Sequence, residues 1–207
     1  MARWEGNAPG RLEQAALALF EEQGYDRTTV AQIAQRANLT ERSFYRWFAD
    51  KREVLFGGSQ ELEAQFVAAI DTVPVSTGAL PTLLAAFATA PRVFRPREFL
   101  LRRAAVIAAN PPLHERELIK LVSISEAIAN ALLHRGCDRD TARLATDIGL
   151  AVLRLATERW MAEEHADLAD FAEALSVSAA DLLAVATGRP VKSHQHPHPQ
   201  SPGCGQL

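Results

Sequence analysis

The sequence predicts an all-α protein, and three observations lead to that prediction. Apolar residues recur at spacings of three and four through most of the 207-residue chain, which is the period of one helix face. No stretch shows the sustained alternation of β-branched residues that marks a strand. Prolines and glycines separate many of the periodic segments, where they would end helices. Nine helices are expected in all.

The first two helices have clear boundary signals. One helix is predicted over residues 10–24, because Gly24 can adopt the left-handed conformation that stops a helix. Thr28 or Thr29 can cap a short second helix. Asn38 can take the positive φ that ends it.

The later helices follow from the same signals. Thr40 is the expected cap of a third helix, and Asp50 the cap of a fourth that starts at Lys51 and runs to about Asp71. The remaining five are expected over residues 80–90, 97–109, 113–135, 138–163 and 167–187.

The segment from Thr28 to Phe56 has the layout of a helix-turn-helix, in which the second of two short helices enters the major groove. The inward residues, which would hold both helices against the first one, are Val30, Ile33, Ala37, Leu39, Phe44 and Phe48. The outward residues of the third helix combine cations, hydroxyls and aromatic rings suited to phosphates and base edges; they are Glu41, Arg42, Ser43, Tyr45, Arg46 and Trp47. Five basic and two acidic residues lie between residues 36 and 52, so the basic patch is local and modest.

This stretch resembles the DNA-binding region of the tetracycline-repressor (TetR) family. The resemblance covers about the first 56 residues and rests on Phe20, Gly24, Tyr25, Thr28, Thr29, Ile33, Ala34, Phe44, Tyr45, Phe48, Lys51 and Leu55. It implies a nine-helix architecture: a three-helix DNA-binding domain followed by a helical domain for ligand binding and dimerisation. The protein would be a repressor that a small, largely apolar effector releases from a pseudo-palindromic operator.

The resemblance also implies roles for single residues. Thr29, Tyr45 and Lys51 would bind phosphates, the last with help from the helix N-terminus on which it is expected to lie. Arg42 is the best candidate for reading a guanine, since its guanidinium can donate to both O6 and N7. Glu41 is better explained as a first-turn acid that complements the helix dipole. The whole expected DNA-binding set is Thr28, Thr29, Thr40, Glu41, Arg42, Ser43, Tyr45, Arg46, Trp47 and Lys51.

Three positions depart from the family pattern. Ala31 stands where many relatives carry a long polar residue, so a base contact from the second helix is expected to be missing. Asn38 replaces the usual glycine. Trp47 replaces a common histidine, and it either contacts a sugar-phosphate edge through its ring nitrogen or packs against the first or fourth helix.

The helices after residue 56 are expected to hold the effector and the dimer interface. By resemblance, a pocket lies among the linking helices, with apolar and polar candidates at Phe66, Leu84, Phe87, Phe99, Arg103, Val106, Ile124, Glu126, Leu155 and Trp160, and His114 as a further polar anchor. The same residues are also what a packed core requires. A homodimer is expected through residues 138–163 and 167–187, which carry more apolar surface than one internal face needs: Leu144, Ala145, Ile148, Gly149, Val152, Leu155, Leu168, Phe171, Leu175, Leu182 and Ala186.

Two alternatives concern the C-terminal helices. They can be a dimerisation module without an effector, which the sequence leaves open. They can also house an enzyme, but no nucleophile elbow, glycine-rich phosphate loop or metal-binding His-Glu motif is present. Cys137 beside His134 lies at a helix C-terminus, where the dipole disfavours a thiolate. We expect no enzyme.

Composition sets the remaining expectations. No run of eighteen apolar residues occurs and the N-terminus has no apolar signal-peptide core, so we expect a cytoplasmic protein without a membrane partner. The net charge of −3 does not exclude DNA binding, which needs only a local patch. The expected organisation is an N-terminal arm (1–9), a DNA-binding domain (10–56), a helical effector and dimerisation domain (57–188) and a disordered tail (189–207). Nothing in that tail would set ligand geometry for a metal at His194, His196, His198 and Cys204, so no metal site or other cofactor is expected.

Overall fold

The computed structural model describes residues 7–163 and 166–191, and over those residues it contains nine α-helices, two short 3-10 helices and no strand. The all-α prediction and the number of α-helices are therefore confirmed for this part of the chain. The elements are α1 (Ala8–Gln23), α2 (Val30–Arg36), α3 (Glu41–Trp47), η1 (Glu53–Phe56), α4 (Ser59–Thr72), α5 (Ala79–Phe87), η2 (Ala90–Arg92), α6 (Arg97–Ala108), α7 (Pro111–His134), α8 (Arg139–Ala162) and α9 (Asp170–Ala186). Most of the predicted tail, with its histidines and Cys204, lies outside the described residues.

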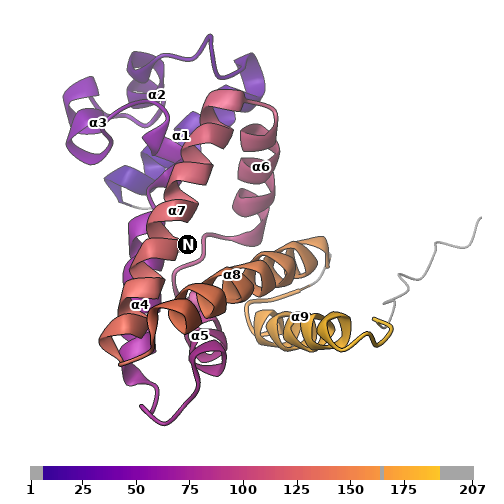
Figure 1. The fold of residues 1–207 in the computed structure, drawn as a ribbon. Helices are drawn as coiled ribbons and strands as arrows, with labels where there is room; N and C mark the ends of the chain where they lie inside the picture. The colour runs from indigo at the N-terminus through magenta and orange to yellow at the C-terminus, as the bar shows by residue number, and fades with distance from the viewer. Residues whose placement is uncertain (1–6, 164–165, 192–207) are drawn as a thin grey trace, which may run out of the picture.

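The helices form two parts, which we call the head (α1 to η1) and the body (α4 to α9) (Figure 1). The long helix α7 runs from the head along the body beside α4. α8 packs against the C-terminal part of α7 and against α5, and α9 lies along α8. None of the helices in the described ranges is long and apolar enough to cross a membrane.

The short helices of the head begin and end where their cap residues dictate. The Thr29 hydroxyl accepts the Gln32 backbone N–H (3.2 Å), while the Gln32 side chain accepts the Thr29 N–H (2.9 Å), which completes a capping box. Thr40 accepts the Ser43 N–H at 3.1 Å and caps α3. Asn38 has a φ of 54°, as predicted, and turns the chain between the two helices.

Two hydrophobic clusters hold the molecule together. The body core contains Phe66, Phe87, Trp160 and Phe171, contributed by four different helices. The head core contains the buried faces of α1 to η1, and four residues of α6 and α7 complete it: Phe99, Val106, Ile107 and Leu113. Head and body therefore share apolar packing across the join between them.

The predicted fourth helix is wrong at its start. Instead of one helix from Lys51, the chain forms the 3-10 turn η1, passes Gly57 and Gly58, and begins α4 at Ser59. Two adjacent glycines disfavour a continuous helix. Gly57 also approaches its neighbours closely, since a Cβ there would lie 2.6 Å from a Glu13 carboxylate oxygen.

The last two helices differ in how well their starts were predicted. Asp138 caps α8 as predicted, by accepting the Thr141 N–H at 2.9 Å. α9 begins at Asp170, three residues later than predicted, because the Asp167 carboxylate closes a turn ahead of the helix. It accepts the N–H of Ala169 (2.6 Å) and of Asp170 (3.2 Å).

Candidate functional site

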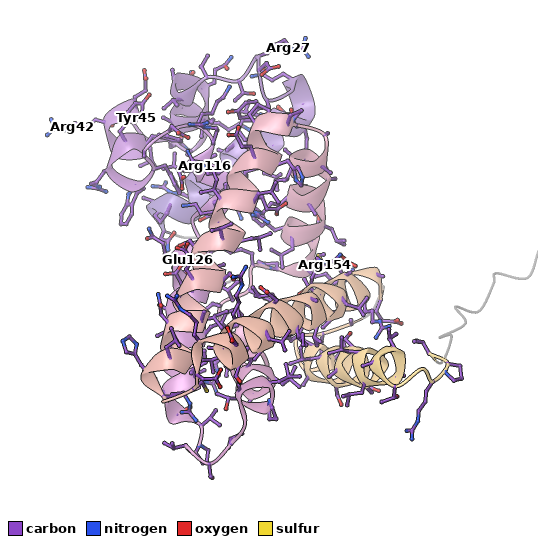
Figure 2. The ribbon with its side chains drawn as sticks, viewed as in Figure 1. Arg27, Arg42, Tyr45, Arg116, Glu126 and Arg154 are labelled. Carbon is purple, nitrogen blue, oxygen red and sulfur yellow. The ribbon has the colours of Figure 1, made fainter. Side chains whose placement is uncertain are left out.

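The outward face of α3 is the most exposed group of functional side chains on the head. Phe44, fully buried, anchors the helix to the head core. Arg42 and Tyr45 point away from the head (Figure 2), and Arg46 is exposed on the same helix. Tyr45 is 55% exposed and Trp47 49%, although both are large apolar groups. Trp47 is thus not buried against another helix, and the Arg46 guanidinium lies 5.3 Å from its ring centroid.

Few cations of the head are available to a partner. Arg36 pairs with Glu22, and Arg52 with Asp50 at 3.0 Å. Among the described residues, Arg42 and Arg46 of α3 form no ion pair, nor does Arg27 in the loop before α2, so these three are exposed cations of the head without an acidic partner. The basic patch is therefore smaller than the count of basic residues suggests.

Some of the hydroxyls that were predicted to bind DNA cap helices in the structure. Thr29, Thr40 and Ser43 lie at the N-termini of α2 and α3, and the two threonines accept backbone N–H groups. Glu41 is an exposed acid in the first turn of α3, consistent with a role toward the helix dipole.

Thr28 is a correction to the predicted set. Its side chain is buried, and its hydroxyl donates to the Gly24 carbonyl at 2.8 Å. Gln23 Nε2 donates to the same hydroxyl at 3.2 Å. Thr28 therefore fixes the loop between α1 and α2 and presents no group to a partner.

Lys51 is also placed differently from the prediction. It precedes η1, not a long helix, and its Nζ donates to the carbonyls of Tyr25 (2.7 Å) and Thr28 (2.9 Å). Nζ also lies 4.0 Å from the Tyr25 ring centroid. Burial lowers the pKa of Lys51. The ammonium group holds the loop that leads into α2.

Sequence reasoning missed one exposed cation of the head. Arg27 lies in the loop before Thr29, exposed to solvent, with its Nε donating to the Gln23 carbonyl at 2.6 Å (Figure 2). A count of basic residues that began before residue 36 would have included it.

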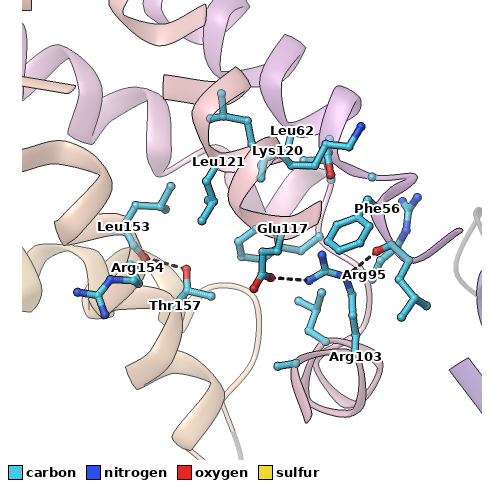
Figure 3. Close-up of a pocket in the computed structure, with 18 of the residues that line it drawn as sticks. Phe56, Leu62, Arg95, Arg103, Glu117, Lys120, Leu121, Leu153, Arg154 and Thr157 are labelled. Atoms are coloured by element: carbon cyan, nitrogen blue, oxygen red, sulfur yellow. Dashed lines mark hydrogen bonds and ion pairs between the residues drawn. The ribbon is translucent and has the colours of Figure 1, made fainter. Parts of the chain in front are cut away.

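A cavity of about 620 Å³ lies where the head meets the body, and we call it the cavity below (Figure 3). Residues of α1, η1, α4, α6, α7 and α8 line it, together with the segment before α6. Its walls are mostly apolar. Its charged lining residues are Glu13, Arg95, Arg103, Glu117, Lys120, Arg154 and Glu158.

Four of the predicted ligand residues line this cavity: Phe66, Phe99, Arg103 and Ile124. The other six do not, and the prediction is corrected for Leu84, Phe87, Val106, Glu126, Leu155 and Trp160. Phe87 and Trp160 are buried in the body core, and Val106 in the head core. Glu126 is exposed on α7, as is the further anchor His114.

The remaining two, Leu84 and Leu155, are partly buried away from the cavity. Residues that were missed on α7 share a face with Ile124: Glu117, Lys120 and Leu121. The spacing of three, four and seven residues from Ile124 was the signal that could have found them.

The eleven predicted dimer residues divide into three groups: five are buried, three are partly buried (Ile148, Leu155 and Leu182) and three are exposed (Leu144, Leu168 and Ala186). Ala145, Gly149, Val152, Phe171 and Leu175 are buried within the subunit, which corrects their assignment to the interface. Leu144 (62% exposed) and Leu168 (47%) are uncovered, as are two residues of α9 outside the prediction, Leu183 and Val185.

The comparisons with known proteins agree with this geometry. Residues 13–56 match the family described as bacterial regulatory proteins, tetR family. The chain is 38% identical over 77 residues to the HTH-type transcriptional regulator TcmR of Streptomyces glaucescens, an alignment that spans 37% of this chain and 34% of that protein. The chain thus matches about a third of the length of this curated relative.

Solved structures resemble the chain over nearly all its length. A putative TetR-family transcriptional regulator from Mesorhizobium loti superposes with a TM-score of 0.56 at 21% identity, covering 89% of this chain and 98% of that one. SmeT, in its complex with triclosan, superposes with a TM-score of 0.54 at 22% identity, covering 84% and 90%. These likenesses establish the fold.

Proposed function

We propose that the chain is a transcriptional repressor of the TetR kind, which binds operator DNA as a homodimer and leaves it when a small molecule enters the cavity. The match of residues 13–56 to the tetR family and the likeness of the fold to TetR-family structures support this proposal. One observation carries the DNA-binding part: α3 rests on a buried Phe44 and exposes Arg42, Tyr45 and Arg46 to solvent. Arg42 and Tyr45 point away from the head (Figure 2). The proteins that the chain resembles are transcriptional regulators rather than enzymes.

The exposed groups of α3 divide between positioning and reading. Arg42, in the first turn, can donate bidentately to a guanine, which gives sequence preference. The Tyr45 hydroxyl and the Arg46 guanidinium, further along the helix, suit phosphate oxygens, which give affinity without preference. Lys51 acts indirectly in this proposal, because its ammonium group fixes the loop between α1 and α2.

Arg42→Ala is expected to weaken binding to the operator and to relax preference at one base pair by about 1–3 kcal/mol. Tyr45→Phe, by contrast, is expected to weaken binding to all sequences similarly. The operator is first selected from random duplexes with the full chain, and affinities are then measured on selected and scrambled DNA at one salt concentration. Arg92→Ala, which removes an exposed arginine of η2, serves as the control. Equal losses on both DNAs for Arg42→Ala would remove its reading role.

The dimer is proposed to form through the uncovered faces of α8 and α9. On α8, Leu144, Ile148, Ala151 and Leu155 are spaced by four, three and four residues and are exposed or partly exposed. This is the spacing of a helix-packing seam. α9 lies beside it with Leu183 exposed, so two subunits could join four helices into a bundle.

Leu144→Arg is expected to convert the dimer to a monomer, because the charge would be buried in the apolar seam. Sedimentation at micromolar concentration is the measurement. Val75→Arg places the same charge on an exposed apolar position of a loop and should leave the dimer intact. A wild-type chain that sediments as a monomer would exclude the proposed dimer.

The effector part of the proposal rests on the cavity. Its volume of about 620 Å³ and its mostly apolar walls suit a small organic molecule. SmeT, which shares the fold, has a structure with bound triclosan. The alternative, a dimer without an effector, assigns no ligand to this cavity.

A continuous fourth helix from Lys51, as predicted, would have connected the DNA-binding end of the head to the cavity. Gly57 and Gly58 interrupt that route. Instead, α7 holds the end of the head through ion pairs: Arg116 with Glu53 at 3.1 Å and with Asp50 at 3.3 Å. A ligand can change operator affinity only by its differential affinity for two positions of the head.

A further inference from the structure

Three of the cations that line the cavity are largely buried, and we call them its cationic side, although Glu13 and Glu117 line the cavity beside them. They are Arg95, Arg103 and Lys120, while α4 and α8 contribute apolar lining residues such as Phe66 and Leu153. The side chains of Arg95, Arg103 and Lys120 are only 13%, 20% and 23% exposed. A ligand that fills this space lies against these three largely buried cations, of which Arg95 and Lys120 have close acidic partners.

Each of these cations is bound to a group of the head. Arg95 pairs with Glu13 of α1 at 3.0 Å. Lys120 Nζ lies 2.9 Å from a carboxylate oxygen of Glu53 in η1. Arg103 Nε donates to the Leu55 carbonyl, also in η1, at 2.6 Å. The cationic side of the cavity thus also connects the body to the head through ion pairs and a hydrogen bond.

Arg103 has the weakest acidic partner of the three. Its guanidinium lies 3.7 Å from a Glu117 oxygen, beyond hydrogen-bond distance, and 4.9 Å from the Phe56 ring centroid. The Leu55 carbonyl is neutral. Among the described residues, no carboxylate hydrogen-bonds Arg103, whereas Arg95 and Lys120 have close acidic partners. Figure 3 shows the Arg103 side chain directed toward Glu117 within the lining.

We propose that the effector is an organic acid with an apolar body, whose carboxylate binds the Arg103 guanidinium while the body fills the apolar side of the cavity. This rests on the proposed function, because it assigns the ligand class of the same cavity. A carboxylate can accept two parallel N–H bonds from a guanidinium, which makes the pair both strong and directional. A neutral carboxamide of the same shape cannot neutralise the charge.

The same contact gives the ligand a way to act on the head. A carboxylate that turns the guanidinium toward itself competes with the Leu55 carbonyl for Nε. η1 would then lose one of its ties to α6 and retain those to α7, from Arg116 and Lys120. The head would be held less firmly in its present position relative to the body.

The test compares matched acids and amides on the full chain by isothermal titration calorimetry. The pairs are naphthalene-2-acetic acid with its amide and decanoic acid with its amide. Wild-type protein is expected to bind at least one acid about tenfold more tightly than the corresponding amide, the size of a charge-assisted hydrogen bond. Arg103→Met should bring each acid to within about twofold of its amide, whereas Arg143→Met, at an exposed arginine of α8 that does not line the cavity, should preserve the difference.

A second variant keeps the test valid if Arg103→Met does not fold. Glu117→Gln removes the acid nearest to Arg103 and should strengthen binding of the acids without strengthening binding of the amides. The proposal is overturned if no acid binds more tightly than its amide, or if Glu117→Gln does not favour the acids. Operator binding by the ligand-free protein is measured separately. Failure of the organic-acid proposal is therefore distinguishable from failure of the DNA-binding proposal.

Discussion

Glu13→Ala is expected to lower the free energy of unfolding by roughly 3–5 kcal/mol, the cost of removing one partner of a buried ion pair. The Glu13 side chain is 3% exposed and accepts two hydrogen bonds from Arg95, at 3.0 and 3.1 Å. Without it, a guanidinium that is 13% exposed keeps the exposed Glu61 as its other acidic partner. Urea denaturation of the full chain is the measurement.

Glu21→Ala provides the matched control, because Glu21 is also an α1 acid paired with an arginine of the body, Arg102 of α6, but their pair lies at the surface. Their pair is 43% and 33% exposed, so its loss should cost no more than about 1 kcal/mol. Equal losses for the two variants would contradict the view that Glu13 and Arg95 are buried partners.

The Glu13 carboxyl also predicts a pH dependence. Its burial raises its pKa, although the hydrogen bonds and charge of Arg95 oppose the shift. A carboxyl whose folded pKa is raised binds more protons folded than unfolded, so its contribution to stability is lost as the pH rises through the folded pKa. The free energy of unfolding of the wild type relative to Glu13→Gln should therefore increase as the pH is lowered toward the unfolded pKa.

Trp160→Ala is expected to destabilise the body by about 3–5 kcal/mol. The indole is 2% exposed, and its Nε1 donates to the Asp167 carbonyl at 2.6 Å. Its ring lies 5.6 Å from that of Phe94 and 6.0 Å from that of Phe171, centroid to centroid. Thermal and urea unfolding measure the loss.

Two further substitutions separate this packing role from the ligand role that the sequence suggested. Trp47→Ala removes a tryptophan that is 49% exposed, and should change stability by no more than about 0.5 kcal/mol. Trp160→Phe retains most of the buried ring, and should leave ligand affinity in the cavity unchanged because Trp160 does not line it. A large drop in that affinity would contradict this prediction and indicate that Trp160 contributes to ligand binding.

The fold could be predicted from the sequence where local chemistry fixes an element boundary. Thr29, Thr40 and Asp138 cap helices as expected, and Asn38 takes a positive φ. Each of these signals involves residues within four positions of one another. The prediction was wrong at Lys51, because the apolar period of the fourth helix predicts a continuous helix there, whereas Gly57 and Gly58 interrupt it.

The cavity was harder to predict, because its lining depends on which helix faces turn toward it. Phe66 and Phe87 are close in space, with ring centroids 4.9 Å apart, yet only Phe66 reaches the cavity. Trp160 and Met161 are neighbours in the chain, and only Met161 lines it. Periodicity identifies buried helix faces, but it does not distinguish a face that lines a cavity from a face that packs in a core, because both carry apolar residues.

The shared packing at the join also bears on how such a regulator could be rebuilt from parts. Phe99, Val106, Ile107 and Leu113 complete the apolar core of the head, although they follow it in the chain by more than forty residues. In a chimera that joins residues 1–56 to the ligand-binding domain of another regulator, the head would lose its contacts with these four residues. Successful exchange of operator specificity should therefore require carrying the head-facing residues of α6, and Leu113 of α7, along with the graft. The alternative is to exchange only the outward residues of α3 and to leave every buried neighbour in place.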